Sequence, residues 1–167
     1  MSPERASLFR YAGLEVGEDR LVGRYELDGR EFCEAVTFDG VGDLRPDGVQ
    51  SIARTWYMLA GLSYYKLGAA QRVQIDGSDA ELALLRAAIV DGLGEFAYRN
   101  DIDLTDVALD SHPDRAIGER VDVDPTRVLT PFGGGIDSVV TVESVALDQA
   151  LFIVSPAAGR FAALETT

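Results

Sequence analysis

A strand, a glycine loop, a helix and a second strand follow one another near the end of the sequence. The apolar run at 128–132 has the length of a buried strand, glycines occupy 133–135, and apolar residues then recur at helical spacing over 136–147. A second apolar run, Ala-Leu-Phe-Ile-Val-Ser, follows. This order is that of a βαβ unit, whose two strands are parallel and whose crossover is right-handed. The sequence therefore predicts a protein of the α/β class.

The beginning of the sequence predicts a β-hairpin. Alternating polar and apolar residues flank the pair Asp28-Gly29 on both sides. Asp-Gly between two such runs favours the tight turn of a hairpin, because the turn requires positive φ angles.

Two helices are predicted after the hairpin. Helical spacing extends over 49–69, where Gly61 weakens the pattern and Gly68 is expected to end the helix. A short strand at 72–77 precedes a second helical pattern, which Ser78 or Asp79 can cap and which fades at Asn100. Residues 1–100 are thus predicted to form an α+β region with a hairpin and two helices.

The stretch 101–126 is predicted to be a connector. It is acidic and is broken by Pro113 and Pro125, and the βαβ pattern begins directly after it. The sequence is thereby divided into an N-terminal region, a connector and a C-terminal segment at 127–167.

Charge and cysteine content limit the classes of function. A formal net charge of −13 argues against binding to a nucleic-acid backbone or to an anionic membrane surface. Cys33 is the only cysteine, so an intrachain disulfide is impossible and a reducing compartment is the simpler location. No run approaches the ~20 apolar residues of a membrane span, and the first residues do not resemble a signal peptide. We expect a cytoplasmic protein.

The glycine loop can be compared with known phosphate-binding loops or interpreted as a simple turn. A Walker-type loop requires a lysine after its glycines, and none is present. A dinucleotide fingerprint requires a third glycine where Ser138 stands, and an acidic residue at the end of the next strand, where Ser155-Pro156 is found. Both interpretations therefore fit poorly, which leaves a bare strand-to-helix turn or a different phosphate loop.

The loop sequence Gly-Gly-Gly-Ile-Asp-Ser resembles the Ser-Gly-Gly-x-Asp-Ser loop of the PP-loop ATP pyrophosphatases. Gly134, Gly135, Asp137 and Ser138 match that motif, whereas Gly133 stands where the family usually has serine. The resemblance implies an ATP site formed by these five residues, in the first βαβ unit of a parallel sheet of the adenine nucleotide alpha hydrolase type. The change at position 133 removes one hydroxyl donor.

Asp137 has two interpretations. A carboxylate beside phosphates is repulsive unless a cation such as Mg²⁺ bridges the two, and Mg²⁺ commonly takes few carboxylates together with phosphate oxygens. Alternatively, Asp137 is an ordinary acidic residue in the first turn of a helix, stabilised by the helix dipole.

Several longer phrases are similar to one family within this group, the bacterial UDP-N-acetyl-alpha-D-muramoyl-L-alanyl-L-glutamate epimerases. The phrases lie at 25–38, 61–69, 92–100, 131–143 and 150–165. The resemblance implies an ATP- and Mg²⁺-dependent enzyme of peptidoglycan precursor synthesis. Such an enzyme inverts the terminal L-Glu of UDP-MurNAc-L-Ala-L-Glu through an acyl-adenylate and releases AMP and pyrophosphate.

Three residues outside the glycine loop are candidates for roles at the substrate. Lys66 could serve as a base if it is buried, because burial disfavours the ammonium form, and the alternative is an exposed lysine on a helix. Arg99 and Asn100, with Glu95 nearby, could bind carboxylates or a diphosphate, and the alternative is the polar end of a helix.

The remaining conspicuous residues are assigned structural roles. Trp56, Tyr57 and Met58 are expected in the core, and Cys33 is expected to be a small buried residue in a strand. His112 lies in a predicted loop and is expected to be a surface turn residue.

The short C-terminal segment leads us to expect a longer enzyme. A PP-loop domain needs several further strands and helices, and only about 30 residues follow Ser138. Two alternatives stay open: a non-catalytic nucleotide-binding or interaction domain, and another PP-loop adenylating enzyme. The sequence indicates neither the proton-transfer residues nor the oligomeric state.

Overall fold

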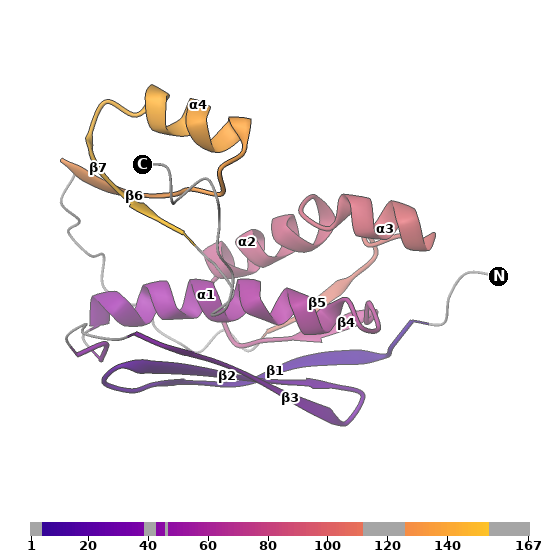
Figure 1. Ribbon diagram of the computed structural model, residues 1–167. Coiled ribbons are helices and arrows are strands. Elements are labelled where there is room, and N and C mark those ends of the chain that lie inside the picture. Colours follow the sequence, from indigo (N-terminus) through magenta and orange to yellow (C-terminus); the bar gives the residue numbers. More distant parts are fainter. Residues whose placement is uncertain (1–4, 39–42, 46, 112–125, 154–167) are drawn as a thin grey trace, which may run out of the picture. The chain divides into compact units, whose positions relative to one another are not determined.

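The computed structural model describes residues 5–38, 43–45, 47–111 and 126–153 (Figure 1). The chain divides into two compact units, Met1–Arg120 and Val121–Thr167. The structure is of the α/β class, as predicted, with a mixed sheet and four helices among the described residues. No helix in these described ranges is long and apolar enough to cross a membrane.

The first unit contains a five-stranded mixed sheet with strand order β3-β2-β1-β4-β5. Its first three strands form an antiparallel meander, and the last two run parallel to β1. The elements of this unit are β1 (Leu8–Val16), β2 (Arg20–Leu27), β3 (Arg30–Thr37), α1 (Asp47–Tyr65), β4 (Arg72–Gln74), α2 (Asp79–Val90), α3 (Gly94–Asn100) and β5 (Ala108–Asp110).

The predicted hairpin is confirmed. Asp28 and Gly29 connect β2 and β3 and have φ angles of 45° and 84°, so both adopt the left-handed conformation that the tight turn requires. The carboxylate of Asp28 also accepts hydrogen bonds from the backbone N–H groups of Ser7 and Leu8, at 2.9 and 2.8 Å. The turn thereby holds the beginning of β1.

The second predicted helix is two helices in the structure. α2 ends at Val90 and α3 begins at Gly94, so the prediction of a single helix was wrong. Gly92 and Gly94 lie at the break, where glycine is the weakest helix former apart from proline. The N–H of Gly92 donates to Ala87 O at 3.2 Å, a bond that closes the end of α2.

The predicted connector at 101–126 contributes a strand to the sheet. β5 lies within it and pairs in parallel with β4, with Val73 opposite Leu109. The strand is only three residues long, which explains why the alternation of its sequence was not recognised.

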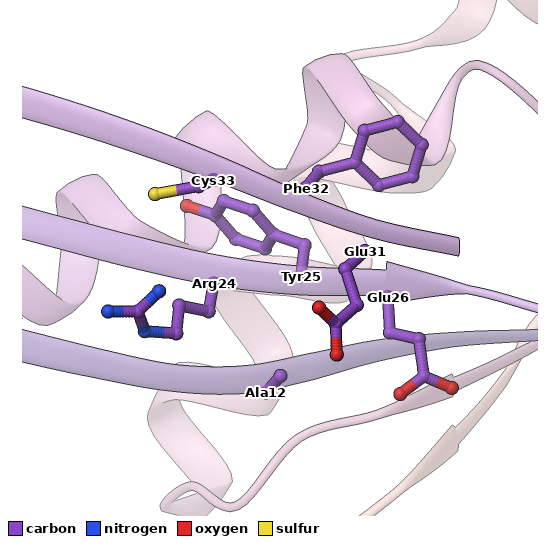
Figure 2. A pocket seen from close by; sticks show the side chains of 7 residues that line it. All are labelled: Ala12, Arg24, Tyr25, Glu26, Glu31, Phe32 and Cys33. Carbon is purple, nitrogen blue, oxygen red and sulfur yellow. The ribbon is translucent and has the colours of Figure 1, made fainter. Parts of the chain in front are cut away.

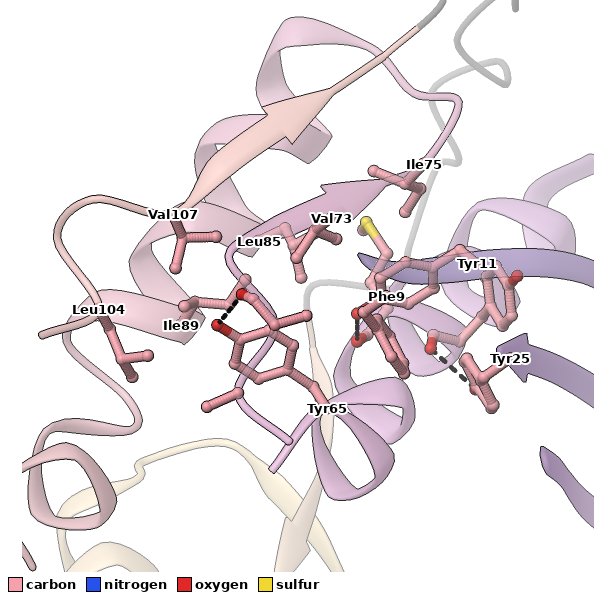
Figure 3. Close-up of a cluster of buried hydrophobic side chains, with 14 residues drawn as sticks. Phe9, Tyr11, Tyr25, Tyr65, Val73, Ile75, Leu85, Ile89, Leu104 and Val107 are labelled. Carbon is pink, nitrogen blue, oxygen red and sulfur yellow. Dashed lines mark hydrogen bonds between the residues drawn. The ribbon is translucent and has the colours of Figure 1, made fainter. Parts of the chain in front are cut away.

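The core of the first unit is rich in tyrosine (Figure 3). Side chains from the strands, α1 and α2 form one buried cluster, whose aromatic members are Phe9, Tyr11, Tyr25, Tyr57 and Tyr65. The rings of Tyr11 and Tyr25 meet edge to face with centroids 5.6 Å apart. Their hydroxyls donate to carbonyls of α1, Tyr11 to Met58 O at 2.7 Å and Tyr25 to Tyr57 O at 3.0 Å. The expectation that Trp56, Tyr57 and Met58 lie in the core is confirmed, with Trp56 only partly buried.

Gly61 has a structural purpose that its sequence position did not reveal. A methyl group at this position of α1 would lie 2.6 Å from Cε1 of Tyr11 and 2.8 Å from Cε1 of Tyr25. The missing side chain therefore lets the two rings approach the helix surface. Met58 and Tyr57, whose carbonyls receive the tyrosine hydroxyls, lie three and four residues before Gly61.

A charged network joins α1 to the start of α2. Ser78 and Glu81 form a reciprocal capping box, in which Ser78 Oγ accepts from Glu81 N and the Glu81 carboxylate accepts from Ser78 N at 2.8 Å. The guanidinium of Arg54 donates to Glu81 at 2.5 Å and to Asp76 O at 2.8 Å. Partial burial acts to raise the pKa of Glu81, but the hydrogen bonds from Arg54 and Ser78 outweigh it and hold that pKa below its ordinary value.

The depressed pKa of Glu81 predicts a loss of stability in acid. A carboxylate whose pKa is lower in the folded state stabilises the fold fully above its unfolded pKa, near 4.3, and this contribution is lost as the pH falls through the folded value. Glu81→Gln should lower the free energy of unfolding by about 1 kcal/mol at pH 7 and make no difference in acid. Urea unfolding of both proteins from pH 7 to pH 3 checks this. An equal difference at every pH would contradict it.

The second unit is the predicted βαβ unit. β6 (Arg127–Pro131) and β7 (Asp148–Phe152) pair in parallel, and α4 (Ile136–Ser144) connects them. The helix ends three residues before the predicted end at Leu147, because Val145 has extended φ and ψ angles of −90° and 113°.

Candidate functional site

The glycine loop lies between β6 and α4 and is exposed. Gly134 has a φ of +74°, a conformation that residues with side chains rarely adopt. Gly135 precedes the helix in an extended conformation, with φ −82° and ψ 167°, and no side chain caps the helix at this point. The glycines of the loop therefore serve two local needs: a left-handed backbone conformation at Gly134, and a helix start at Gly135 that has no side-chain cap.

The first turn of α4 presents backbone donors. Among the residues that the structure describes, Ile136, Asp137 and Ser138 have no acceptor for their N–H groups, and Val139 is the first to bond, to Gly135 O at 3.2 Å. Free N–H groups at a helix N-terminus, together with the positive end of the helix dipole, favour an anion. The loop thus has the local chemistry of a phosphate site.

Ser138 closes the loop. The N–H of Gly133 donates to Ser138 Oγ at 3.0 Å, which ties the end of the strand to the first turn of the helix. Since the hydroxyl acts as acceptor in this bond, its own proton is left for another acceptor. The structure therefore brings the five residues of the predicted site into one short loop.

Asp137 is an exposed carboxylate in the first turn of α4. Within the described ranges, no group of three or more acidic, histidine or cysteine side chains could hold a metal ion. A Mg²⁺ at Asp137 would therefore take its other ligands from phosphate oxygens and water, as this ion commonly does. Asp137 is the single carboxylate of the loop that could face such an ion.

The loop geometry makes glycine necessary at one position and dispensable at another. Gly134→Ala should destabilise the loop by about 1 kcal/mol, because alanine is strained at positive φ. Gly133→Ser should be tolerated, since its new Cβ would meet only Ser138 Oγ, at an ordinary 3.7 Å. The amide chemical shift of Val139, whose N–H donates to Gly135 O, is measured in both variants and checks this prediction. An undisturbed shift in Gly134→Ala, or a disturbed loop in Gly133→Ser, would contradict it.

The other predicted site residues lie in the first unit and are exposed. Lys66 lies in the turn after α1, so the burial on which its proposed role depends is absent from this chain. Arg99 pairs with Glu95 of its own helix at 3.0 Å, and Asn100 Nδ2 donates to Phe96 O at 2.8 Å. The arrangement at the end of α3 is thus that of a polar helix end. His112 lies outside the described residues.

A hollow lies along β1, β2 and β3 (Figure 2), next to the point where a bulge interrupts the pairing of β1 with β2. Arg24 is 3.7 Å from Glu15, and Glu26 is 3.2 Å from Arg10. These charges are therefore compensated by neighbours on the sheet rather than directed at a ligand. The hollow is lined by Ala12, Arg24, Tyr25, Glu26, Glu31, Phe32 and Cys33.

The expectation that Cys33 is buried was wrong. Alternate residues of β3 are exposed, and Cys33 belongs to that set, whereas Phe32 and Glu34 are partly covered. The hydroxyl of Tyr64 in α1 donates to the Glu34 carboxylate at 2.6 Å. The set that contains Glu34 therefore faces the helix, and the set that contains Cys33 faces away from it. Strand residues alternate between the two faces, and here the helices cover only one of them.

Two polar residues of the second unit were missed by sequence reasoning. Thr130 in β6 is buried, with 3% of its surface exposed, and its hydroxyl donates to Gln149 Oε1 in β7 at 3.1 Å. Thr130 lay within the predicted strand 128–132, whereas Gln149 stood just before the predicted second strand, which begins at Asp148 in the structure rather than at Ala150.

Comparison with known proteins gives a consistent family. A family model described as the MurL N-terminal domain matches residues 1–166. A UDP-N-acetyl-alpha-D-muramoyl-L-alanyl-L-glutamate epimerase from Xanthomonas oryzae pv. oryzae (strain MAFF 311018) is 33% identical over 135 residues, which are 72% of this chain and 29% of the relative. Proteins of the same name from Salinispora tropica and Micromonospora sp. are each 34% identical over 144 residues, 77% of this chain.

The alignments cover only part of these relatives. They span 29% to 32% of the relatives' own length. No solved structure is detectably similar to this chain.

Proposed function

Since the chain belongs to the MurL N-terminal domain family, we propose that it is the N-terminal part of an ATP-dependent epimerase. Its substrate would be UDP-MurNAc-L-Ala-L-Glu, whose terminal L-Glu is converted to D-Glu during peptidoglycan precursor synthesis. The observation that carries the proposal is the family match along almost the whole chain, together with relatives named for this epimerisation.

The proposed chemistry explains why such an epimerase would use ATP. The α-hydrogen beside a free carboxylate is very weakly acidic, because the carbanion would carry a second negative charge next to the first. Adenylation of the carboxylate removes its charge and makes the α-proton removable by an ordinary base. Hydrolysis of the acyl-adenylate then releases AMP and the free acid with either configuration at the α-carbon.

The glycine loop is the proposed site of the ATP phosphates. The N–H groups of Ile136, Asp137 and Ser138 lack acceptors within the described chain and can receive phosphate oxygens. The hydroxyl of Ser138 can donate one further bond while its oxygen still holds Gly133. Asp137 would share a Mg²⁺ with the phosphates, which neutralises the charge that would otherwise repel them. The resulting nucleotide domain would be of the PP-loop type.

The acid–base groups of the reaction are proposed only by residue type. Lys66 is the only lysine of the sequence and is the candidate base, and Arg99 and Asn100 are the candidate ligands of the substrate's carboxylates. All three are exposed, so each role requires that the remaining part of the enzyme covers them. Lys66→Arg keeps the positive charge but replaces the amine by a guanidinium, which cannot act as a base. The variant should therefore lose epimerisation while AMP release stays intact.

The test measures AMP release with Mg-ATP and UDP-MurNAc-L-Ala-L-Glu. It uses this chain and a form extended in frame through any continuing coding sequence, each with an Asp137→Asn variant as the matched control. We expect AMP and D-Glu only with that peptide and only with Asp137 intact. ATP binding without AMP release from either form would instead support a non-catalytic nucleotide-binding domain, and AMP release with another acid would support a different adenylating enzyme.

A further inference from the structure

The helix that follows the glycine loop is held with little apolar packing. α4 has no buried side chain, and Thr130 is the one buried side chain among the described residues of the second unit. Apolar side chains of this unit are instead open to solvent, as Leu129 at 62% and Ile136 at 78% show. The position of α4 over its strands therefore depends on polar contacts to an unusual degree.

The amide of Gln149 makes those contacts. From β7, its Nε2 donates to the carbonyls of Val142 and Val145 at 2.8 and 2.9 Å, at the C-terminal end of α4. The last carbonyls of a helix have no partner within the helix, so the amide satisfies two groups that would otherwise lack one. Its Oε1 accepts from Thr130 Oγ1 at 3.1 Å. One side chain thus connects both strands to the helix.

These bonds bear directly on the glycine loop. The loop starts three residues after Thr130 and ends where α4 begins, so both of its ends belong to elements that Gln149 joins. A rotation or slide of α4 would separate Ser138 from the N–H of Gly133, which now lie 3.0 Å apart. The N–H groups of the first turn would be redirected by the same movement.

We propose that Gln149 is a positioning residue for the glycine loop, acting through the C-terminal end of α4 and through Thr130. Its amide holds the helix in the position in which the N–H of Gly133 bonds to Ser138 Oγ. That Gln149 thereby supports phosphate binding rests on the proposed function, whereas its effect on the conformation of the loop does not.

The test compares amide exchange in Gln149→Leu, Gln149→Glu and Thr130→Ser by NMR, with each rate normalised to that of an unstructured peptide. In Gln149→Leu the protection of the Gly133 amide should fall about tenfold or more, because three hydrogen bonds are lost. Gln149→Glu can still accept from Thr130 but loses both donated bonds at neutral pH, so it should show a large part of the same loss there and regain some protection in acid, where the carboxyl can donate again. Thr130→Ser keeps the hydroxyl and should retain the protection.

A second amide, that of Phe132, distinguishes a loss of loop positioning from unfolding of the second unit. Phe132 N, which donates to Phe152 O at 2.9 Å in the ladder of β6 and β7, should stay protected in every variant. Unchanged protection of Gly133 in Gln149→Leu would overturn the proposal, as would equal losses at Gly133 and Phe132. ATP is then titrated into the wild-type chain and Gln149→Leu. A loop effect without ATP binding to the wild-type chain or to its extended form would contradict the proposed function and leave this inference standing.

Discussion

Replacing Gly61 by alanine should destabilise the protein by about 2–3 kcal/mol, although alanine is the better helix former by ~1 kcal/mol. The added methyl group would lie 2.6 Å from the ring of Tyr11 and 2.8 Å from that of Tyr25. Neither ring can swing aside freely, because each packs in the aromatic cluster and each hydroxyl bonds to a carbonyl of α1. The substitution therefore costs packing and, where the rings are displaced, buried hydrogen bonds.

Gly94→Ala is the matched control for Gly61→Ala. It adds the same group to another helix glycine, where nothing lies within 4 Å of the new atom. Denaturant unfolding should show Gly94→Ala as stable as the wild-type protein or slightly more stable. If Gly61→Ala behaved in the same way, the close approach of the rings to α1 would not be a determinant of stability.

The buried tyrosines should make the protein unfold steeply in alkali. Burial is the main cause that raises the pKa values of the four buried tyrosines, Tyr11, Tyr25, Tyr57 and Tyr65, that of Tyr57 to about 12. A group whose pKa is raised on folding stabilises the fold fully below its unfolded pKa, here about 10, and this contribution is lost as the pH rises towards the folded value. Four such tyrosines reduce the free energy of unfolding by about 5 kcal/mol for each pH unit above 10. That slope exhausts a typical domain stability of about 5–15 kcal/mol within a few pH units.

Two substitutions test this explanation of alkaline unfolding. The measurement is an alkaline titration followed by circular dichroism and by the ultraviolet absorbance of tyrosinate. Tyr11→Phe should make the loss of stability with pH about a quarter less steep, since one of the four buried groups no longer ionises. Tyr98→Phe removes a ring that is 88% exposed and should leave the transition where it is. A transition that is equally steep in Tyr11→Phe would contradict the explanation.

Sequence reasoning succeeded where a few adjacent residues determine the structure. The hairpin was predicted because Asp28-Gly29 has few conformations available other than the turn that the structure shows. The βαβ unit was predicted because its apolar runs and its glycine loop are consecutive. The loop residues Gly133 to Ser138 could be grouped for the same reason, since only six positions are involved.

Features that depend on distant partners were missed. Gly61 was regarded as a weak point in a helix, whereas the rings that require it, those of Tyr11 and Tyr25, lie 50 and 36 positions earlier in the chain. The side of β3 on which Cys33 lies is decided by α1, and the strand β5 exists only because β4 offers it an edge. Gln149 was missed although the carbonyls of Val142 and Val145 are close in sequence, because its third partner, Thr130, lies in the other strand. Gly61, Cys33 and β5 depend on tertiary contacts that a window of neighbouring residues does not contain.

The strand order of the first unit also has a consequence during synthesis. β1 is made first and is the middle strand of the sheet, with β2 on one side and β4 on the other. The partner strand β2 follows β1 immediately in the sequence. The other partner, β4, in which Arg72 pairs with Leu8, is synthesised much later. While a ribosome adds the residues between them, the nascent chain displays an unpaired strand edge next to aromatic side chains. Such an edge is a site for wrong pairing between neighbouring chains and for chaperone binding. The interval ends only when β4 emerges from the exit tunnel.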